Sequence, residues 1–323
     1  MSLMIKGELR SDWLESETRE GEFVRQDSQF RHWITPDGSP GPTGEGGFAA
    51  EAGRYHLYVS WACPWAHRTL IFRKLKGLED LISVSVVNPY MHEPGWSFDP
   101  HPGSTPDHLH GARYMHELYA RADPQYTGIV TVPVLWDRKR DTIVNNESAE
   151  IIRMFNSAFD ALTDRREDYY PQALCAEIDA VNERVYETVN NGVYRAGFAT
   201  SQDAYDRAFD ALFDSLDWLE ACLAGQRYLV GGQITEADWR LFTTLVRFDA
   251  VYYSHFKCNR RRLVDYPNLW GFARELYQVE GIAETVHLEQ IKTHYYGSHE
   301  QLNPSGIIPR GPLLDFGAPH GRG

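Results

Sequence analysis

One short segment, residues 55–68 (YHLYVSWACPWAHR), constrains the fold more than any other part of the chain. Bulky apolar residues alternate with polar ones from Tyr55 to Trp61, which is the period-two pattern of a half-buried strand. Pro64 suits the first position of a helix, where a missing N–H costs nothing and the ring pre-sets the helical φ angle. The pattern therefore predicts a strand that turns directly into a helix, with Cys63 as the N-cap residue.

The N-cap position gives Cys63 a chemical role. The first N–H groups of a helix have no partner within the helix and carry partial positive charge, so they stabilise an anion such as a thiolate. We therefore expect Cys63 to be a nucleophile. The redox motif Cys-x-x-Cys reads here Cys63-Pro64-Trp65-Ala66, so an alanine stands where a second thiol would resolve a mixed disulfide. That second thiol must come from a ligand or from elsewhere in the fold.

The composition is that of an ordinary globular protein with room for two domains: 323 residues, 42% of them hydrophobic. The net charge of −13 argues against nucleic acid or an anionic membrane surface as the main partner. No apolar run has the length of a membrane span or the form of a signal peptide, so we expect a cytoplasmic location. The four cysteines, Cys63, Cys175, Cys222 and Cys258, have no paired spacing, which favours reduced thiols over disulfides or a zinc site.

The order of elements after the first strand predicts a mixed sheet. We expect a helix over 64–76, a strand over 82–87, a long loop over 88–111, a helix over 112–122, strands over 131–136 and 141–144, and a helix from Glu147. This β-α-β-α-β-β-α order is typical of the thioredoxin-like fold, in which Pro133 would follow a cis peptide bond. Residues 1–50 form an N-terminal extension with a turn-rich run at 35–47, either wrapped around the domain or flexible.

Beyond a polar linker at 159–171 the pattern becomes helical. Apolar periodicity predicts helices over 172–190, 202–224, 235–255, 267–278 and 280–292. We therefore expect an all-α domain over 172–302, followed by an irregular tail over 303–323. Thr235 and Asp238 have the spacing of a capping box, and Ile234 and Trp239 that of a hydrophobic staple, so we assign these residues to folding.

Five strings occur in order along nearly the whole chain: CPWAHR, NPYMHEPGWSF, TVPVLWD, NNESAEIIRMF and NNGVYRAGFA. Together with the cysteine N-cap and the all-α second domain, they resemble the glutathionyl-hydroquinone reductases, also called Xi-class glutathione transferases. The resemblance implies a thioredoxin-like glutathione-binding domain over 51–158 followed by an all-helical glutathione-transferase domain. It also implies a homodimer and a wrapped N-terminal extension.

The resemblance implies a glutathione site at the helix that starts near Glu147. Glu147 would pair with the ammonium of the ligand, while the Ser148 hydroxyl and the helix N–H groups would receive its γ-glutamyl carboxylate. Taken alone, the two residues are a favourable first-turn acid and a cap. Val132 would pair through its main chain with the cysteinyl part, with Val130 and Thr131 leading into it.

Other positions are less informative. Trp96 resembles a family tryptophan that lies against glutathione, although a loop tryptophan is more often a packing anchor. Ile129 stands where family members often carry arginine, so the resemblance does not carry over the charged contact to glutathione at this position. His108, His110 and His116 lack convincing ligand spacing and are assigned to the surface. With no phosphate-binding Gly-rich motif either, we expect glutathione as co-substrate and neither a metal nor a nucleotide.

Three tyrosines of the second domain, Tyr194, Tyr252 and Tyr295, would be core residues by pattern alone. The resemblance implies instead that Tyr194 donates a proton to the aromatic substrate. It further implies that the hydroxyls of Tyr252 and Tyr295 stabilise the thiolate. The adjacent Tyr253 and Tyr296 leave the register open by one position.

The implied reaction is the reduction of a glutathionyl-hydroquinone to a hydroquinone. Cys63 would attack the glutathionyl sulfur, and a second glutathione would release the enzyme as glutathione disulfide. The alternatives are a general thioltransferase or dehydroascorbate reductase of the Omega type, and a non-catalytic interaction module on the same fold.

Overall fold

The computed structural model describes residues 2–10 and 18–323, and these form two compact units. The first holds residues 2–10 and 25–167, and the second holds residues 18–24 and 168–323. The boundary after residue 167 falls inside the segment predicted as a linker. Part of the predicted N-terminal extension, residues 18–24, belongs with the second unit.

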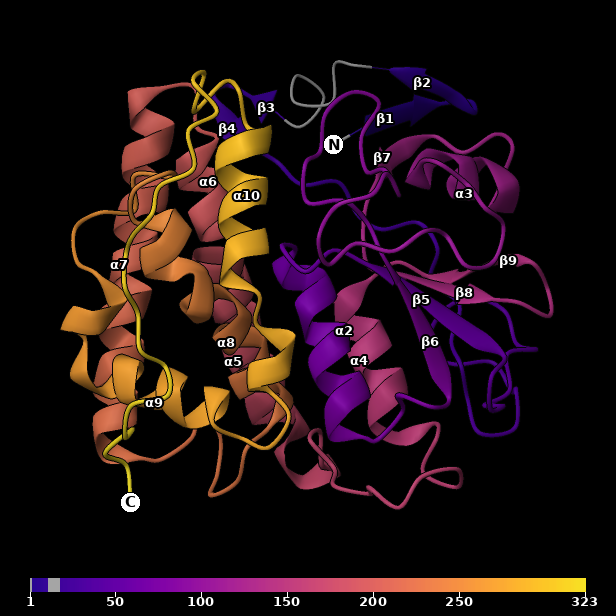
Figure 1. The fold of residues 1–323 in the computed structure, drawn as a ribbon. Helices are drawn as coiled ribbons and strands as arrows, with labels where there is room; N and C mark the ends of the chain where they lie inside the picture. Colours follow the sequence, from indigo (N-terminus) through magenta and orange to yellow (C-terminus); the bar gives the residue numbers. More distant parts are fainter. Residues whose placement is uncertain (1, 11–17) are drawn as a thin grey trace. The chain divides into compact units, whose positions relative to one another are not determined.

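A four-stranded sheet forms the centre of the first unit. Its strands follow the order β6 (Ile82–Val86), β5 (Tyr55–Val59), β8 (Val134–Asp137) and β9 (Thr142–Asn145). Strands β5 and β6 are parallel, whereas β8 is antiparallel to both of its neighbours. Helices α2 (Pro64–Leu75) and α4 (Ser148–Ser157) pack together on one face of this sheet (Figure 1). The thioredoxin-like fold is thereby confirmed.

The strand predicted to be half-buried, β5, is buried on both faces instead. Its His56 lies 2.9 Å from the hydroxyl of Ser85, and burial lowers the pKa of His56 to about 3, so the ring is uncharged at neutral pH. Tyr58 donates a hydrogen bond of 2.8 Å to Asp107 in the loop after β6. That loop covers the face that alternation had assigned to solvent. The prediction was wrong because hydrogen bonds from distant residues satisfy the polar side chains of this strand.

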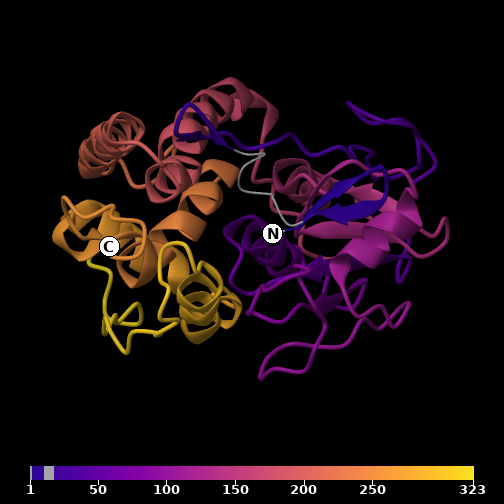
Figure 2. The same cartoon turned by 90° about the horizontal axis from the view of Figure 1, so that it is seen from above.

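The N-terminal extension pairs with strand edges of the first unit. Strand β1 (Ser2–Ile5) lies between β2 (Glu8–Arg10) and β7 (Gly128–Val130) in a three-stranded antiparallel sheet (Figures 1 and 2). Farther along, Arg31 forms a bridge with Asn145 of β9, and the His32 N–H donates to the Val144 carbonyl at 3.0 Å. Pairing of this kind protects edges that would otherwise be open. It supports the wrapped interpretation for the described residues of the extension; positions 11–17 lie outside them.

The strand predicted over 131–136 begins only after Pro133, and a separate strand, which was not predicted, precedes residue 131. Strand β7 ends at Val130 and β8 begins at Val134, and the bond between Val132 and Pro133 is cis, as predicted. The correction follows from proline itself, which has no N–H to donate to a strand ladder.

Among the described residues of the second unit, the regular secondary structure is helical apart from the short hairpin of β3 (Thr18–Arg19) and β4 (Glu22–Phe23), and residues 303–323 contain neither helix nor strand. Its α-helices are α5 (Cys175–Val185), α6 (Gly192–Gly197), α7 (Gln202–Gly225), α8 (Glu236–Arg247), α9 (Pro267–Tyr277) and α10 (Leu288–Ser298). Two π-helical turns, η2 (Tyr186–Asn190) and η3 (Phe248–Tyr252), and three 3₁₀ turns, η1 (Gln172–Leu174), η4 (Leu263–Asp265) and η5 (Ala283–Thr285), complete the unit. The all-α prediction is confirmed.

Two helix predictions need correction. The helix expected over 280–292 is the turn η5 followed by α10, because the extended backbone of Val286 (φ −102°, ψ 109°) separates them. The helix expected from residue 112 is α3 (Met115–Ala122), which begins later because the extended Tyr114 forms a capping box with Glu117.

The capping box of α8 is present as predicted, and its acid is fully buried. Asp238 accepts hydrogen bonds from the Thr235 N–H at 2.7 Å, the Thr235 hydroxyl at 3.0 Å and the Leu229 N–H at 2.8 Å. Burial raises the pKa of Asp238 to about 6. Three donors therefore depend on one buried carboxyl group.

We predict that Asp238→Ala lowers the free energy of unfolding by about 2–4 kcal/mol, because it leaves buried donors without an acceptor. Glu117→Ala is the matched control: it removes the acid of the same motif at an exposed site, and should cost about 0.5–1 kcal/mol. Urea denaturation followed by circular dichroism measures both losses. Equal losses of unfolding free energy in the two variants would show that burial of the acid does not increase the contribution of the α8 box to stability.

Candidate functional site

Cys63 caps α2 as predicted. Its backbone is extended (φ −72°, ψ 121°), and its sulfur accepts the Ala66 N–H at 3.4 Å. The thiol also donates to the Val132 carbonyl at 3.3 Å, and the residue is 8% exposed. The sulfur is thus held between a helix N-terminus, which favours its anion, and the main chain just before Pro133.

The start of α4 carries the second group of predicted residues. Glu147 is the N-cap, and its carboxylate accepts the Ala149 N–H at 2.9 Å and the Ser28 hydroxyl at 3.2 Å. The hydroxyl of the buried Ser148 accepts a hydrogen bond of 3.3 Å from the guanidinium of Arg68, which leaves its own hydrogen to be donated elsewhere. This helix end therefore offers a carboxylate for an ammonium group and a hydroxyl donor for a carboxylate.

Arg68, which the sequence patterns did not single out, lies beside the predicted site residue Ser148. It lies on α2 with 1% exposure, and its guanidinium is 4.6 Å from the centre of the Trp65 ring. The guanidinium of Arg25 lies 5.1 Å from the same ring. A signal was present, because Arg68 ends the CPWAHR string and lies on a mostly buried helix. It brings a permanent positive charge to Ser148.

The three residues predicted around the cis proline differ in their contacts. Val130 pairs with Ser2 of β1, and the carbonyl and N–H of Thr131 both bond to the hydroxyl of Tyr119, at 3.0 and 3.3 Å. Val132 is the one whose carbonyl contacts the Cys63 sulfur. Main-chain groups of Val130 and Thr131 are thus already hydrogen-bonded within the protein.

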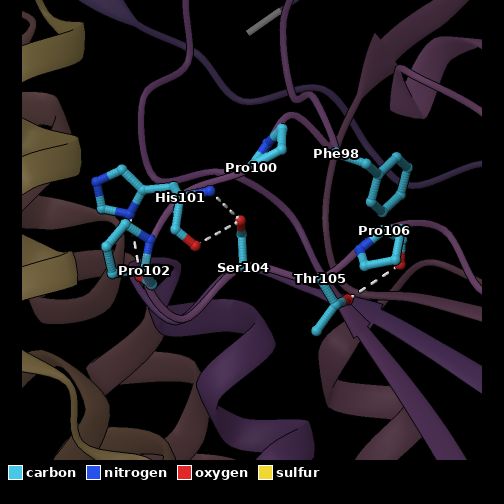
Figure 3. Close-up of a pocket in the computed structure, with 7 residues that line it drawn as sticks. All are labelled: Phe98, Pro100, His101, Pro102, Ser104, Thr105 and Pro106. Atoms are coloured by element: carbon cyan, nitrogen blue, oxygen red, sulfur yellow. Dashed lines mark hydrogen bonds between the residues drawn. The ribbon is translucent and has the colours of Figure 1, made fainter.

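The loop after β6 carries Trp96, which is 4% exposed and whose carbonyl accepts the Met115 N–H at 3.0 Å. Gly103 lies farther along this loop, and its carbonyl accepts a hydrogen bond of 2.8 Å from the indole N–H of Trp61. This bond connects the loop to the turn that carries Cys63. The loop also forms an open hollow of about 500 Å³ (Figure 3). It is lined mainly by apolar side chains, from Phe98, Pro100, His101, Pro102, Ser104, Thr105 and Pro106.

The three predicted tyrosines meet in the second unit. The Tyr295 hydroxyl lies 2.5 Å from that of Tyr194 and 3.0 Å from that of Tyr252. Burial raises the pKa of Tyr252 and of Tyr295 well above the usual value for a phenol, so both stay protonated at neutral pH. The hydroxyl of Tyr296 instead contacts Ser254, so Tyr295 is the member of that pair that joins the cluster. Tyr252 closes the π-helical turn η3, a type of turn frequent at functional sites.

The histidines considered for a metal do not converge. His108 is exposed and bonds to Ser85 at 3.0 Å, and His110 lies 3.5 Å from Asp141. Over residues 2–10 and 18–323, the structure contains no cluster of three or more potential metal ligands. Nor does any helix in that part of the chain combine the length and apolar character of a membrane span.

Two family models match the chain. Residues 62–158 match the glutathione S-transferase N-terminal domain, and residues 202–275 match the glutathione S-transferase C-terminal domain.

Full-length relatives are also found. Glutathionyl-hydroquinone reductase YqjG from Escherichia coli (strain K12) is 60% identical over 323 residues, covering 100% of this chain and 98% of the relative. Glutathionyl-hydroquinone reductase PcpF from Sphingobium chlorophenolicum is 54% identical over 312 residues, covering 97% and 96%. The glutathione-bound structure of YqjG superposes with a TM-score of 0.92 at 58% identity over 99% of this chain and 98% of that one. An Xi-class glutathione transferase from Natrialba magadii gives 0.93 at 53% identity over 100% and 97%.

We predict that Cys63 is the most reactive thiol of the chain. Brief treatment with iodoacetamide at pH 7 should alkylate Cys63 at least about tenfold faster than Cys175 or Cys222, because only Cys63 caps a helix with its sulfur. Cys258 should react last, since burial strongly raises its pKa. Peptide mass spectrometry measures the order of labelling. Equal rates at Cys63 and Cys175 would contradict activation by the helix.

Proposed function

This chain belongs to the glutathione transferases and, within them, to the Xi-class glutathionyl-hydroquinone reductases, and on that premise we propose that it reduces glutathionyl-hydroquinones to hydroquinones with glutathione as the reductant. The observation that carries the proposal is the helix-capping sulfur of Cys63, with Ala66 where a resolving thiol would stand. A lone activated thiol needs an external thiol to complete a redox cycle.

Glutathione fits the chemistry of the α4 helix start. Its ammonium would meet the Glu147 carboxylate, and its γ-glutamyl carboxylate would meet Ser148, whose hydroxyl is oriented by Arg68. Its cysteinyl part would pair with the main chain of Val132 beside the reactive sulfur. Trp96 would pack against the peptide, with Val130 and Thr131 supporting the same strand end.

The first step breaks a carbon–sulfur bond. The Cys63 thiolate attacks the sulfur of the glutathionyl-hydroquinone and forms a disulfide between Cys63 and glutathione. The electron pair of the broken bond stays on the aromatic carbon, which takes up a proton supplied by Tyr194 and leaves as the hydroquinone.

The second step regenerates the enzyme. The thiolate of a second glutathione attacks the glutathionyl sulfur of the mixed disulfide, and Cys63 leaves as a thiolate. The products of the cycle are one hydroquinone and one glutathione disulfide, so the two electrons gained by the ring carbon come from the two glutathione sulfurs.

The other tyrosines would act as neutral donors. Tyr252 and Tyr295 keep their protons, and the two bonds within the cluster use two of the three phenolic hydrogens. We propose that the remaining hydrogen lets one of these two hydroxyls at a time stabilise the thiolate. We place the reaction in the cytosol, where the four free cysteines would stay reduced, and propose that the protein acts as a homodimer.

Replacing Cys63 by serine tests the mechanism. With a glutathionyl-hydroquinone and free glutathione as substrates, Cys63→Ser should lower kcat at least about 10³-fold, because the hydroxyl is a far weaker nucleophile. The wild type should release glutathione disulfide and hydroquinone in equal amounts, measured by chromatography. Cys175→Ser is the matched control and should keep full activity. Substantial turnover by Cys63→Ser would rule out the covalent route.

The same assay separates the rival activities. Dehydroascorbate and a glutathione–peptide mixed disulfide are offered to the wild type beside the glutathionyl-hydroquinone. A higher kcat/KM for either than for the aromatic substrate would favour a general thioltransferase of the Omega type. Failure to turn over any of the three would favour a non-catalytic module.

Removing the Tyr194 hydroxyl should affect only the first step. We predict that Tyr194→Phe slows release of the hydroquinone by about 10–100-fold, because the ring carbon loses its proton source. Reduction of the preformed Cys63–glutathione disulfide by glutathione should change less than about twofold, since no carbon is protonated there. Tyr296→Phe, which removes a hydroxyl bonded to Ser254, is the matched control. Rapid mixing measures the two half-reactions, and an equal slowing of both would exclude Tyr194 as the proton donor.

A further inference from the structure

A single buried hydroxyl, that of Tyr119, joins two of the segments proposed to hold glutathione. Tyr119 lies on α3 and is 0% exposed. Its hydroxyl donates to the Thr131 carbonyl at 3.0 Å and accepts from the Thr131 N–H at 3.3 Å and from the side-chain amide of Asn146 at 3.2 Å. The Thr131 hydroxyl is also 3.2 Å away. A phenol has one hydrogen and two lone pairs, so these partners use its whole hydrogen-bonding capacity.

Each partner of Tyr119 directly precedes a residue of the proposed site. Thr131 precedes Val132, whose carbonyl contacts the reactive sulfur. Asn146 precedes Glu147, the N-cap of α4. The hydroxyl therefore connects the cis-proline segment to the helix start that would receive the γ-glutamyl end.

The frame around this hydroxyl is closely bonded. The Asn146 side-chain oxygen accepts the Phe30 N–H at 3.1 Å, and the Asn146 N–H donates to the Phe30 carbonyl at 3.1 Å. The Asn146 carbonyl accepts the Ser28 hydroxyl at 3.2 Å. The ring of Tyr119 packs against Phe30 and Tyr126, with centroids 5.8 and 4.9 Å away. The N-terminal extension thus helps to hold Asn146 in place.

We propose that Tyr119 is a positioning residue that sets the spacing between the Val132 segment and the Glu147 helix cap, so that both ends of the γ-glutamyl-cysteinyl unit are held at once. The inference rests on the proposed function only in taking glutathione as the ligand. Because the covalent bonds of this unit limit its reach, a wider spacing between the two segments loses one set of contacts or the other. A tyrosine that only filled the core would contribute to stability and leave glutathione affinity unchanged.

The test compares two buried tyrosines of the same cluster. Tyr119→Phe removes the bridging hydroxyl. Within the described part of the chain, the hydroxyl that Tyr126→Phe removes bonds to the Ile129 carbonyl alone, at 3.0 Å. Isothermal calorimetry with reduced glutathione measures affinity without turnover, and urea denaturation measures stability.

We expect Tyr119→Phe to weaken glutathione binding by about tenfold, the effect of roughly one hydrogen bond, and Tyr126→Phe to change it by less than about twofold. Tyr119→Phe should also lose more stability than Tyr126→Phe, because it leaves the bonded groups of Thr131 and Asn146 without their partner. Unchanged glutathione affinity in Tyr119→Phe, or an equal loss of glutathione affinity in the two variants, overturns the inference. A wild type that binds no glutathione overturns it as well.

A second variant keeps the test independent of how well Tyr119→Phe folds. Asn146→Ser removes the amide that reaches the phenol, and we expect it to weaken glutathione binding by a similar factor. The double variant with Tyr119→Phe should then be weaker than the worse single variant by less than about twofold, because both changes break the same bridge. Fully multiplicative losses contradict a shared role. If glutathione binding responds as expected while glutathionyl-hydroquinones are not turned over, the proposed reaction fails and the role of Tyr119 stands.

Discussion

The N–H groups at the start of α2 are the feature on which the proposed chemistry of this protein depends. The Ala66 N–H points at the Cys63 sulfur and favours the thiolate, whereas the Val132 carbonyl can accept only from a protonated sulfur. The two contacts therefore favour opposite protonation states of one atom. Main-chain pairing of glutathione at Val132, as proposed above, would use the same residue whose carbonyl holds the thiol.

Charge is placed differently in the two units. The first unit has the N-termini of α2 and α4, a capping carboxylate at Glu147 and the buried cation of Arg68, which are suited to a zwitterionic peptide. The tyrosine cluster of the second unit consists of phenols linked hydroxyl to hydroxyl, and burial keeps Tyr252 and Tyr295 protonated. Such groups suit an aromatic molecule that must gain a proton. The division agrees with the two halves of the proposed reaction.

Local signals predicted the helix starts well. Cys63 caps α2, and Thr235 and Asp238 form the box at α8, because a cap depends on residues within three positions of each other. At α4 the cap is Glu147, one residue before Ser148, which the local pattern had indicated. The same reasoning missed the start of α3 at Tyr114, where an aromatic residue occupies the N-cap. It also extended one helix through Val286, since apolar periodicity does not reveal a single residue with extended backbone.

The sequence by itself determined the order of elements around the central sheet, the cysteine at the start of α2, the missing second cysteine and, through resemblance, the family. Only the tertiary structure decided which polar residues are buried and what they bind. His56 lies inside because Ser85 reaches it from the next strand, Arg68 reaches Ser148 from another helix, and Tyr119 joins two loops that are 12 and 27 residues away along the chain. The residues next to a side chain in the sequence determine the geometry of its turn or cap. Its hydrogen-bond partners from distant parts of the chain come within reach only after the chain has folded.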